Sequence, residues 1–167
     1  MTHALMIPRR SLLLGGAALT LTACAPGKAD ASEAQYASSP FRRVTDAQWR
    51  QRLPAASYQT LRHEGTERPF TSPLNDQHRA GTFVCRGCEL PLFRSQWKFD
   101  SGTGWPSFYD VIAANVGTKR DLAIGFPRTE YHCARCLGHQ GHIFDDGPRP
   151  TGKRYCNNGV ALMFKPA

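Results

Sequence analysis

The pattern of hydrophobic and polar positions changes twice along this chain of 167 residues. Ser11 to Thr20 is a continuous stretch of apolar and small residues, whereas residues 25–40 hold few large apolar side chains. Two segments with helical signals follow, and beyond them short apolar runs alternate with Gly, Pro, Asn and Asp. The pattern predicts a targeting segment, a linker, and then one folded domain in which helices precede strands.

The first helical signal begins at Thr45. Thr45 and Gln48 have the spacing of a capping box, so a short helix is expected to begin there and to end before Pro54. A second helix is predicted over Ala55 to Glu64, ended by Gly65. Both would form a small helical cover at the N-terminal side of the domain.

Short runs rich in Val, Ile, Phe and Tyr mark the remainder of the chain. Each is bounded by turn-forming residues, which is typical of short antiparallel strands. These runs are Gly81–Val84, Asp121–Phe126, Glu130–His132 and Tyr155–Phe164. We therefore expect a mainly β fold, in one domain covering residues 41–167.

Residues 1–23 have the layout of a bacterial signal peptide. Arg9 and Arg10 precede the apolar stretch, and paired arginines favour the twin-arginine export route. Leu-Thr-Ala directly before Cys24 resembles the lipobox of lipoproteins, in which the cysteine is acylated and becomes the new N-terminus. We expect an exported protein, lipid-anchored at the periplasmic face of the envelope. An ordinary signal with an incidental cysteine is the alternative.

Residues 24–40 are rich in Ala, Ser and Pro. They cannot bury enough apolar surface to offset their ordering entropy, so a flexible tether is predicted. The formal charge is +8, and removing residues 1–23 takes away Arg9 and Arg10, which leaves 8 − 2 = +6. The remaining basic residues are scattered, which favours a solvated basic surface facing an anionic membrane over a nucleic-acid site.

Four of the six cysteines form two Cys-x-x-Cys pairs, Cys85 with Cys88 and Cys133 with Cys136. Each pair can present two thiolates from one tight turn, which is half of a tetrahedral zinc site. The sequence predicts one structural zinc ion bound by all four. Disulfides in an oxidising compartment and a redox-active Cys-x-x-Cys are the alternatives.

Cys156 is left without an assigned partner, and its neighbours favour a reactive thiol over a buried inert one. On a strand, alternation would place Arg154, Cys156 and Asn158 on one face, where a guanidinium favours the thiolate and an amide donates to a polar oxygen. His139 and His142 lie upstream in a glycine-containing run and are candidates for proton transfer.

Trp105 stands between Gly104 and Pro106 on a rigid turn. Such a tryptophan is either a core plug or one wall of a small apolar pocket, and Phe108 is a candidate for a second wall.

These motifs together resemble the peptide-methionine (R)-S-oxide reductases, the B type of methionine sulfoxide reductase. The resemblance rests on Gly-Trp-Pro-Ser-Phe, Gly-His-x-Gly-His-Ile-Phe-Asp-Asp-Gly-Pro and Arg-Tyr-Cys-x-Asn, with two Cys-x-x-Cys pairs interleaved. Gly-Thr-Glu-Arg-Pro-Phe at residues 65–70 also matches, and the resemblance covers about residues 45–165. It implies a zinc-stapled fold of two small antiparallel sheets with short N-terminal helices.

The resemblance also implies the role of each residue. Cys156 would attack the sulfoxide sulfur and become a sulfenic acid, while Trp105 packs on the S-methyl group. His142 and Asn158 would orient a water or the sulfoxide oxygen, supported by His139 and Arg154. The substrate would be oxidised methionine in proteins or peptides.

Thr103 departs from the commonest family pattern, which has a resolving cysteine at this position. The resemblance therefore implies that an external thiol, such as a thioredoxin-like protein, reduces the sulfenic acid on Cys156 directly. Two other readings remain open, a zinc-stapled binding module and a thiol–disulfide oxidoreductase. Nothing in the sequence suggests more than a monomer.

Overall fold

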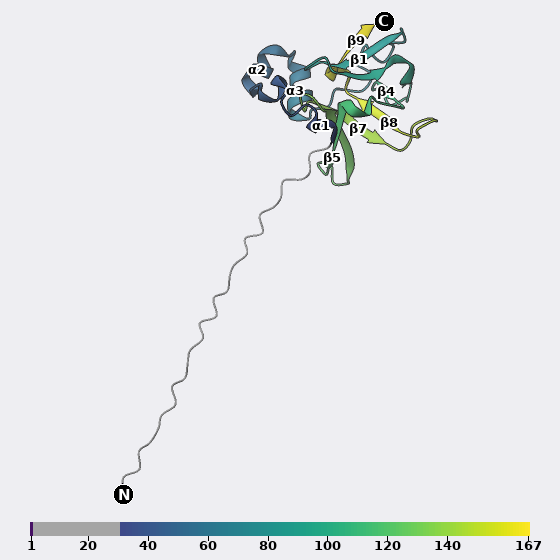
Figure 1. The fold of residues 1–167 in the computed structure, drawn as a ribbon. Coiled ribbons are helices and arrows are strands. Elements are labelled where there is room, and N and C mark those ends of the chain that lie inside the picture. The colour runs from purple at the N-terminus through teal and green to yellow at the C-terminus, as the bar shows by residue number, and fades with distance from the viewer. Residues whose placement is uncertain (2–30) are drawn as a thin grey trace.

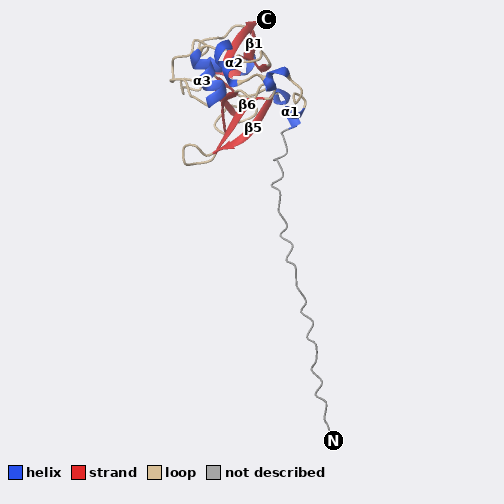
Figure 2. Ribbon diagram, turned by 90° about the vertical axis from the view of Figure 1, so that its left-hand side faces the viewer, coloured by secondary structure: helices blue, strands red, loops and turns tan. Residues whose placement is uncertain are grey.

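The computed structural model describes Met1 and residues 31–167, and Figures 1 and 2 show how its elements are arranged. The helices are α1 (Ala31–Ala34), η1 (Pro40–Arg43), α2 (Asp46–Arg52), α3 (Ala55–His63), η2 (Ser95–Trp97), η3 (Ala113–Asn115) and η4 (Gly159–Ala161), where η marks a 3-10 helix. The strands are β1 (Gly81–Cys85), β2 (Pro91–Arg94), β3 (Lys98–Phe99), β4 (Ser107–Phe108), β5 (Val116–Asp121), β6 (Arg128–Cys133), β7 (His139–Phe144), β8 (Arg154–Asn157) and β9 (Leu162–Pro166). Within the described ranges, no helix is long and apolar enough to cross a membrane. The predicted signal peptide at residues 1–23 and the acylation of Cys24 concern positions outside the described residues.

The strands form two antiparallel sheets. A three-stranded sheet has the order β2-β1-β9, and a six-stranded sheet has the order β3-β4-β8-β7-β6-β5. Figure 1 shows α2 and α3 together at one side of the sheets. The expected mainly β fold, with two antiparallel sheets and short helices at the N-terminal side, is confirmed.

The core lies between the two sheets and is built from aromatic rings. Phe93 of the small sheet stacks on Phe108 of the large sheet, with ring centroids 4.1 Å apart. Phe83 meets Phe108 edge-on at 4.9 Å, and Tyr155 approaches Phe93 at 6.1 Å. Aromatic pairs in these geometries contribute beyond the burial of their area, so they hold one sheet against the other.

The two helices predicted in the domain both form, for local reasons. Thr45 caps α2 with both hydrogen bonds of a capping box, from Gln48 N to Thr45 Oγ1 and from Thr45 N to Gln48 Oε1. Helix α3 ends at Glu64, which has a left-handed φ of 55°, and the N–H of Gly65 bonds to the Gln59 carbonyl. The helices bury one face each, which carries Trp49, Tyr58 and Leu61.

The strand predicted over Asp121–Phe126 is wrong. β5 ends at Asp121, and the residues beyond it form the turn that leads to β6. The Asp121 carboxylate accepts from the N–H of Ala123, and Gly125 has a φ of 86°. This turn leaves Leu122, Ile124 and Phe126 exposed, so their apolar alternation marks a hairpin tip.

The single run predicted over Tyr155–Phe164 is two strands in different sheets. β8 lies inside the large sheet, η4 follows, and β9 crosses to the edge of the small sheet. Periodicity alone cannot show this crossover, because both strands carry the same kind of apolar residues.

The predicted tether over residues 24–40 is corrected for residues 31–40, which pack on the domain. Ser32 Oγ donates to the Val116 carbonyl at 2.6 Å, and Tyr36 OH donates to Asn115 at 2.8 Å. The carboxylate of Glu33 lies 2.8 Å from the Nε2 atom of His132. Three polar anchors thus order a segment whose composition predicts disorder, and the folded part extends N-terminally of residue 41.

Candidate active site and metal centre

Cys156 lies near the middle of the six-stranded sheet. In the pairing of β8 its register partners are Ser107 on β4 and His142 on β7. Opposite residues of an antiparallel pair project to the same face. The topology therefore brings the thiol and an imidazole together from positions 14 residues apart in the chain.

A cavity of about 130 Å³ opens at Cys156. Its lining residues are Thr66, Trp105, Arg128, His142, Phe144, Cys156, Asn157 and Asn158. The structure thus brings together four of the predicted residues, namely the cysteine, the tryptophan, one histidine and one asparagine. The cavity is open to solvent on one side and is small enough for a single short side chain.

Trp105 is held by the segment that precedes the strands. Its indole Nε1 donates to the carbonyl of Glu67 at 3.0 Å, and the N–H of Phe70 donates to the Gly104 carbonyl at 2.7 Å. Gly104 has a φ of 90°, and a Cβ there would lie 2.7 Å from the Phe70 nitrogen. Only glycine allows this approach, which fixes the indole as a cavity wall.

The prediction that Phe108 lines the pocket is wrong. Phe108 is fully buried and stacks on Phe93 in the core. It is the neighbour of Ser107 on β4, so alternation turns it to the opposite face of the sheet from Cys156. Phe144 provides the aromatic wall in its place.

His142 is half-buried and is held by two residues that the sequence did not indicate. Its Nε2 atom lies 2.7 Å from Asp121 Oδ2, and Asp121 also pairs with Arg128. Burial lowers the pKa of His142, Asp121 opposes this, and the positive charge of Arg128 adds to the lowering. The backbone N–H of Ala123, followed by His142 and Arg128, holds the pKa of Asp121 well below its usual range.

His139 stands behind His142 and does not line the cavity. The two rings are 5.5 Å apart, and His139 Nδ1 lies 2.7 Å from Glu130 Oε1. Glu130 is 2% exposed, and burial would raise its pKa. Hydrogen bonds with His132 and His139 outweigh that burial and hold the pKa of Glu130 at about 2.

Arg154 is directed at the thiol but its charge is shared. It hydrogen-bonds the Cys156 sulfur, and it also forms a bidentate pair with Asp146, both distances being 2.8 Å. Its guanidinium carbon lies 4.3 Å from the centroid of the Phe144 ring. Burial raises the pKa of Cys156, whereas Arg154 and then Thr103 lower it. Burial prevails over the thiolate-stabilising effect that the sequence predicted for Arg154, because Asp146 offsets part of the positive charge.

Asn158 lines the cavity, yet most of its amide is used in holding the backbone. Its Nδ2 donates to the Gln140 carbonyl at 3.0 Å, and its Oδ1 accepts from the N–H of Glu67 at 3.0 Å. The Glu67 carboxylate in turn accepts from the N–H groups of Gly159 and Val160. Asn158 therefore ties β7 to the segment that carries Trp105, with one N–H left for the cavity.

Sequence reasoning missed Asp121, Arg128, Glu130, Phe144 and Asp146. Asp146 and Phe144 lie in the quoted Phe-Asp-Asp-Gly-Pro motif, so the sequence held a signal for both. Asp121 and Arg128 flank a hairpin tip, and no local pattern marks them as partners of a histidine on another strand.

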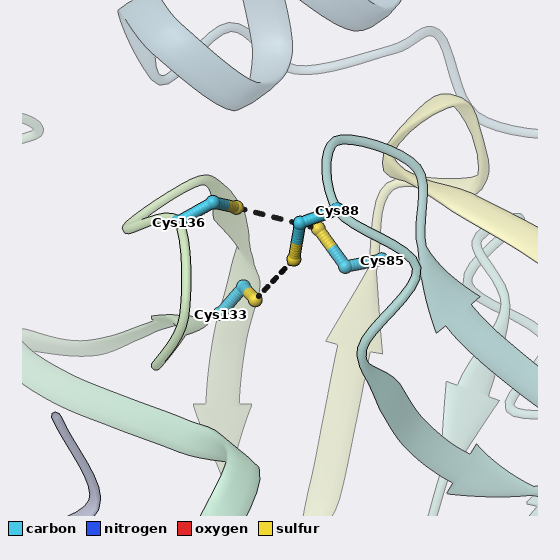
Figure 3. A group of neighbouring side chains, drawn as sticks. All are labelled: Cys85, Cys88, Cys133 and Cys136. Atoms are coloured by element: carbon cyan, nitrogen blue, oxygen red, sulfur yellow. Dashed lines mark hydrogen bonds between the residues drawn. The ribbon is translucent and has the colours of Figure 1, made fainter. Parts of the chain in front are cut away.

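The four paired cysteines form one buried cluster at the end of the sheets (Figure 3). Their Sγ atoms all lie within 4.8 Å of one another. The closest approaches, 3.6 Å for Cys85–Cys136 and 3.4 Å for Cys88–Cys133, join one pair to the other. No disulfide forms among the described cysteines. Contacts between the pairs disfavour a cycle in which one Cys-x-x-Cys closes on itself.

The cluster fits a tetrahedral metal ion. Four thiolates at about 2.3 Å from a zinc ion would be about 3.8 Å from one another, close to the observed separations. Hydrogen bonds from the neighbouring thiols hold the pKa of Cys133 well below its usual range. Hydrogen bonding within the cluster, with burial, raises the pKa of Cys85 and of Cys136 well above it. One negative charge shared by four thiols is what a dication would convert into four thiolates.

Comparison with known proteins agrees with this geometry. Residues 53–166 match the family described as SelR domain. Peptide methionine sulfoxide reductase B1, chloroplastic, of Oryza sativa is 53% identical over 123 residues, which are 73% of this chain and 58% of that protein. Two proteins named peptide methionine sulfoxide reductase MsrB are also similar. That of Thiobacillus denitrificans is 52% identical over 73% of this chain and 93% of its own length. That of Pseudomonas putida is 55% identical over 71% of this chain and 90% of its own length. The match therefore spans a little over half of the rice protein and nearly all of the bacterial ones.

Proposed function

This chain belongs to the SelR-domain family, and from that membership we propose that it is a peptide-methionine (R)-S-oxide reductase acting at Cys156. The observation that carries the proposal is the cavity in which the thiol, Trp105 and His142 meet. A methyl sulfoxide needs a small apolar slot beside polar groups, and a slot of fixed shape discriminates between the two configurations at sulfur.

The chemistry begins with the Cys156 thiolate, which attacks the sulfur of the sulfoxide. The sulfoxide oxygen is a poor leaving group until it is protonated, and His142, oriented by Asp121, supplies a proton to it. The oxygen ends on Cys156. Methionine sulfoxide is thereby reduced to methionine, the thiol is oxidised to a sulfenic acid, and the proton lost by the thiol is balanced by the one given to the oxygen.

An external thiol regenerates the enzyme. A first thiol attacks the sulfenic acid, releasing water and leaving a mixed disulfide on Cys156, and a second thiol releases the reduced enzyme. Thr103 occupies the position where many relatives have a resolving cysteine, and Cys156 is half-exposed, so a partner thiol can reach it. A thioredoxin-like protein is the proposed reductant. Trapping with a sulfenic-acid reagent after one turnover should label Cys156.

Residues 85, 88, 133 and 136 are proposed to hold one structural zinc ion, which joins the β1 turn to the β6 turn. The ion is remote from the chemistry in this scheme. Its contribution is to folding, because a preformed set of four thiolates rarely exists in an unfolded chain.

The proposed location is the periplasmic face of a bacterial envelope, with the protein acting as a monomer on oxidised methionines of exported proteins. The support is the sequence alone, in the paired Arg9 and Arg10 and the Leu-Thr-Ala-Cys24 motif. Metabolic labelling with palmitate should transfer label to the wild type and not to Cys24→Ser.

The decisive test of the activity is the reduction of a methionine (R)-sulfoxide peptide with dithiothreitol, next to the (S) epimer. The (R) form should turn over and the (S) form should not, and Cys156→Ser should abolish turnover while zinc content and melting temperature stay unchanged. Turnover of neither epimer by the wild type would overturn the proposal.

A further inference from the structure

Thr103 has a direct contact with the proposed nucleophile. Its hydroxyl is a hydrogen-bond partner of the Cys156 sulfur. Thr103 lies on the loop between β3 and β4, and the glycines on either side of it have left-handed φ values, 71° at Gly102 and 90° at Gly104. The loop conformation therefore depends on two glycines that aim this side chain.

Three hydroxyls form a continuous chain behind the thiol. Ser101 Oγ lies 2.8 Å from Thr103 Oγ1 and 2.8 Å from Ser107 Oγ. Ser107 is fully buried and donates to the carbonyl of Trp105 at 3.1 Å. The chain thus connects the sulfur of Cys156 with the backbone of the residue that walls the cavity.

The Trp105 carbonyl sets the direction of the protons in this chain, because it can only accept. Ser107 gives its one hydroxyl proton to that carbonyl, so its oxygen accepts from Ser101. Ser101 then has no proton left for Thr103. The hydroxyl proton of Thr103 has two possible acceptors, Ser101 and the sulfur, and an anionic sulfur is the stronger of the two.

We propose that Thr103 is a catalytic residue, whose hydroxyl, positioned by Ser101 and Ser107, donates a hydrogen bond to the Cys156 thiolate. The inference rests on the proposed function, in which Cys156 is the nucleophile. In the thiol state the S–H donates to Thr103, which donates to Ser101. When the S–H bond breaks and its proton passes to water in the cavity, the Thr103 hydroxyl turns its hydrogen onto the sulfur.

The other charged groups around the sulfur explain why such a donor matters. Arg154 on the same strand is paired with Asp146, whose negative charge opposes the thiolate. His142 on β7 is engaged with Asp121, and Arg128 on β6 is engaged with the same carboxylate. Each cation near Cys156 therefore has a carboxylate of its own, whereas Thr103 brings a donor without an accompanying negative charge.

The test measures the thiol itself. The full-length, zinc-loaded chain is alkylated with iodoacetamide across a range of pH, and the Cys156-containing peptide is quantified by mass spectrometry. Thr103→Val and Thr103→Ala should raise the midpoint of the rate profile by about one pH unit, which is a tenfold slower reaction at neutral pH. Thr103→Ser keeps a hydroxyl and should keep the wild-type midpoint. Thr129→Val, at an exposed position on β6, is the matched control and should also leave it unchanged.

A midpoint in Thr103→Val and Thr103→Ala that matches the wild type, or a Thr103→Ser variant that behaves like Thr103→Ala, would overturn the inference. Alanine is small and is included in case the valine variant does not fold. The assay contains no sulfoxide, so it separates two failures. A wild type that alkylates as expected but reduces no sulfoxide contradicts the proposed function. A wild type that reduces sulfoxide, with an unshifted midpoint in both hydroxyl-free variants, contradicts only the role of Thr103.

Discussion

His142 and Cys156 are register partners across β7 and β8, so the imidazole and the thiol project to the same face of the large sheet. Neither residue has a partner for this arrangement in its own local sequence. The hairpin that joins the strands contains Asp146, which binds Arg154 next to the thiol. One strand pairing therefore sets the acid, the nucleophile and the nearest cation in a common geometry.

Replacing Asp121 by Asn should move the pH profile of the reaction. Burial lowers the pKa of His142 and the Asp121 carboxylate opposes this, so its loss lowers that pKa further and frees Arg128 to add to the effect. The active form carries a protonated His142, which exists below its pKa. The alkaline limb of kcat/KM should thus shift to lower pH by about one unit.

The measurement is kcat/KM for a methionine (R)-sulfoxide peptide over the range in which histidine titrates. Asp145→Asn is the control, because Asp145 is an exposed neighbour in the β7–β8 hairpin and pairs only with Lys153 among the described residues. An alkaline limb that stays in place in Asp121→Asn would show that His142 is not the proton donor.

Phe108 and Phe144 should separate stability from activity. Phe108→Ala removes a fully buried ring from the interface of the sheets and should lower the free energy of unfolding by about 3–5 kcal/mol. Phe144→Ala removes a partly exposed cavity wall that also contacts Arg154, and should lower kcat/KM several-fold, by about 1 kcal/mol. Urea unfolding and steady-state kinetics measure the two effects. The reverse assignment of effects would return Phe108 to the pocket.

Glu130 should contribute to stability in a pH-dependent way. Its pKa of about 2 in the folded protein lies below the ordinary value of 4.5, so the shift of about 2.5 units corresponds to about 3 kcal/mol. A depressed folded-state pKa means that this contribution is complete above pH 4.5 and is lost as the pH falls toward 2. Glu130→Gln should be less stable than the wild type at neutral pH, and the difference should shrink on acidification.

Denaturant titrations of wild type and Glu130→Gln at several pH values test this, with Glu89→Gln, at an exposed ion pair with Lys165, as the control. A constant difference between wild type and Glu130→Gln at all pH values would mean that packing, and not the charge of Glu130, accounts for its effect.

Removal of the metal should unfold the domain. Structural zinc contributes on the order of 10 kcal/mol to folding, which is comparable with the whole stability of a domain of this size. Chelation, or Cys85→Ser, should therefore abolish the cooperative thermal transition, and stoichiometric zinc should restore it in the chelated wild type. A chain that melts normally without metal would show that the thiol cluster is stable by itself.

The helices and the metal site could be predicted from the sequence because their signals are local. Thr45 and Gln48 form a capping box from side chains three residues apart, and each Cys-x-x-Cys presents two thiols from one turn. Strand assignments were less secure. Leu122, Ile124 and Phe126 have strand-like alternation but lie in a turn, because Gly125 and the Asp121 carboxylate bend the chain there.

The sequence by itself determined which residue types meet the chemistry: a lone cysteine, a tryptophan on a rigid turn, histidines among glycines, and four thiols for a metal. Only the tertiary structure decided their partners. Asp121 reaches His142, Asp146 offsets Arg154, and Thr103 contacts the sulfur. It also turned Phe108 into the core and packed residues 31–40 onto the domain. The physical reason is that hydrogen bonds and charge pairs between strands depend on register and sheet order, which residue spacing along the chain does not encode.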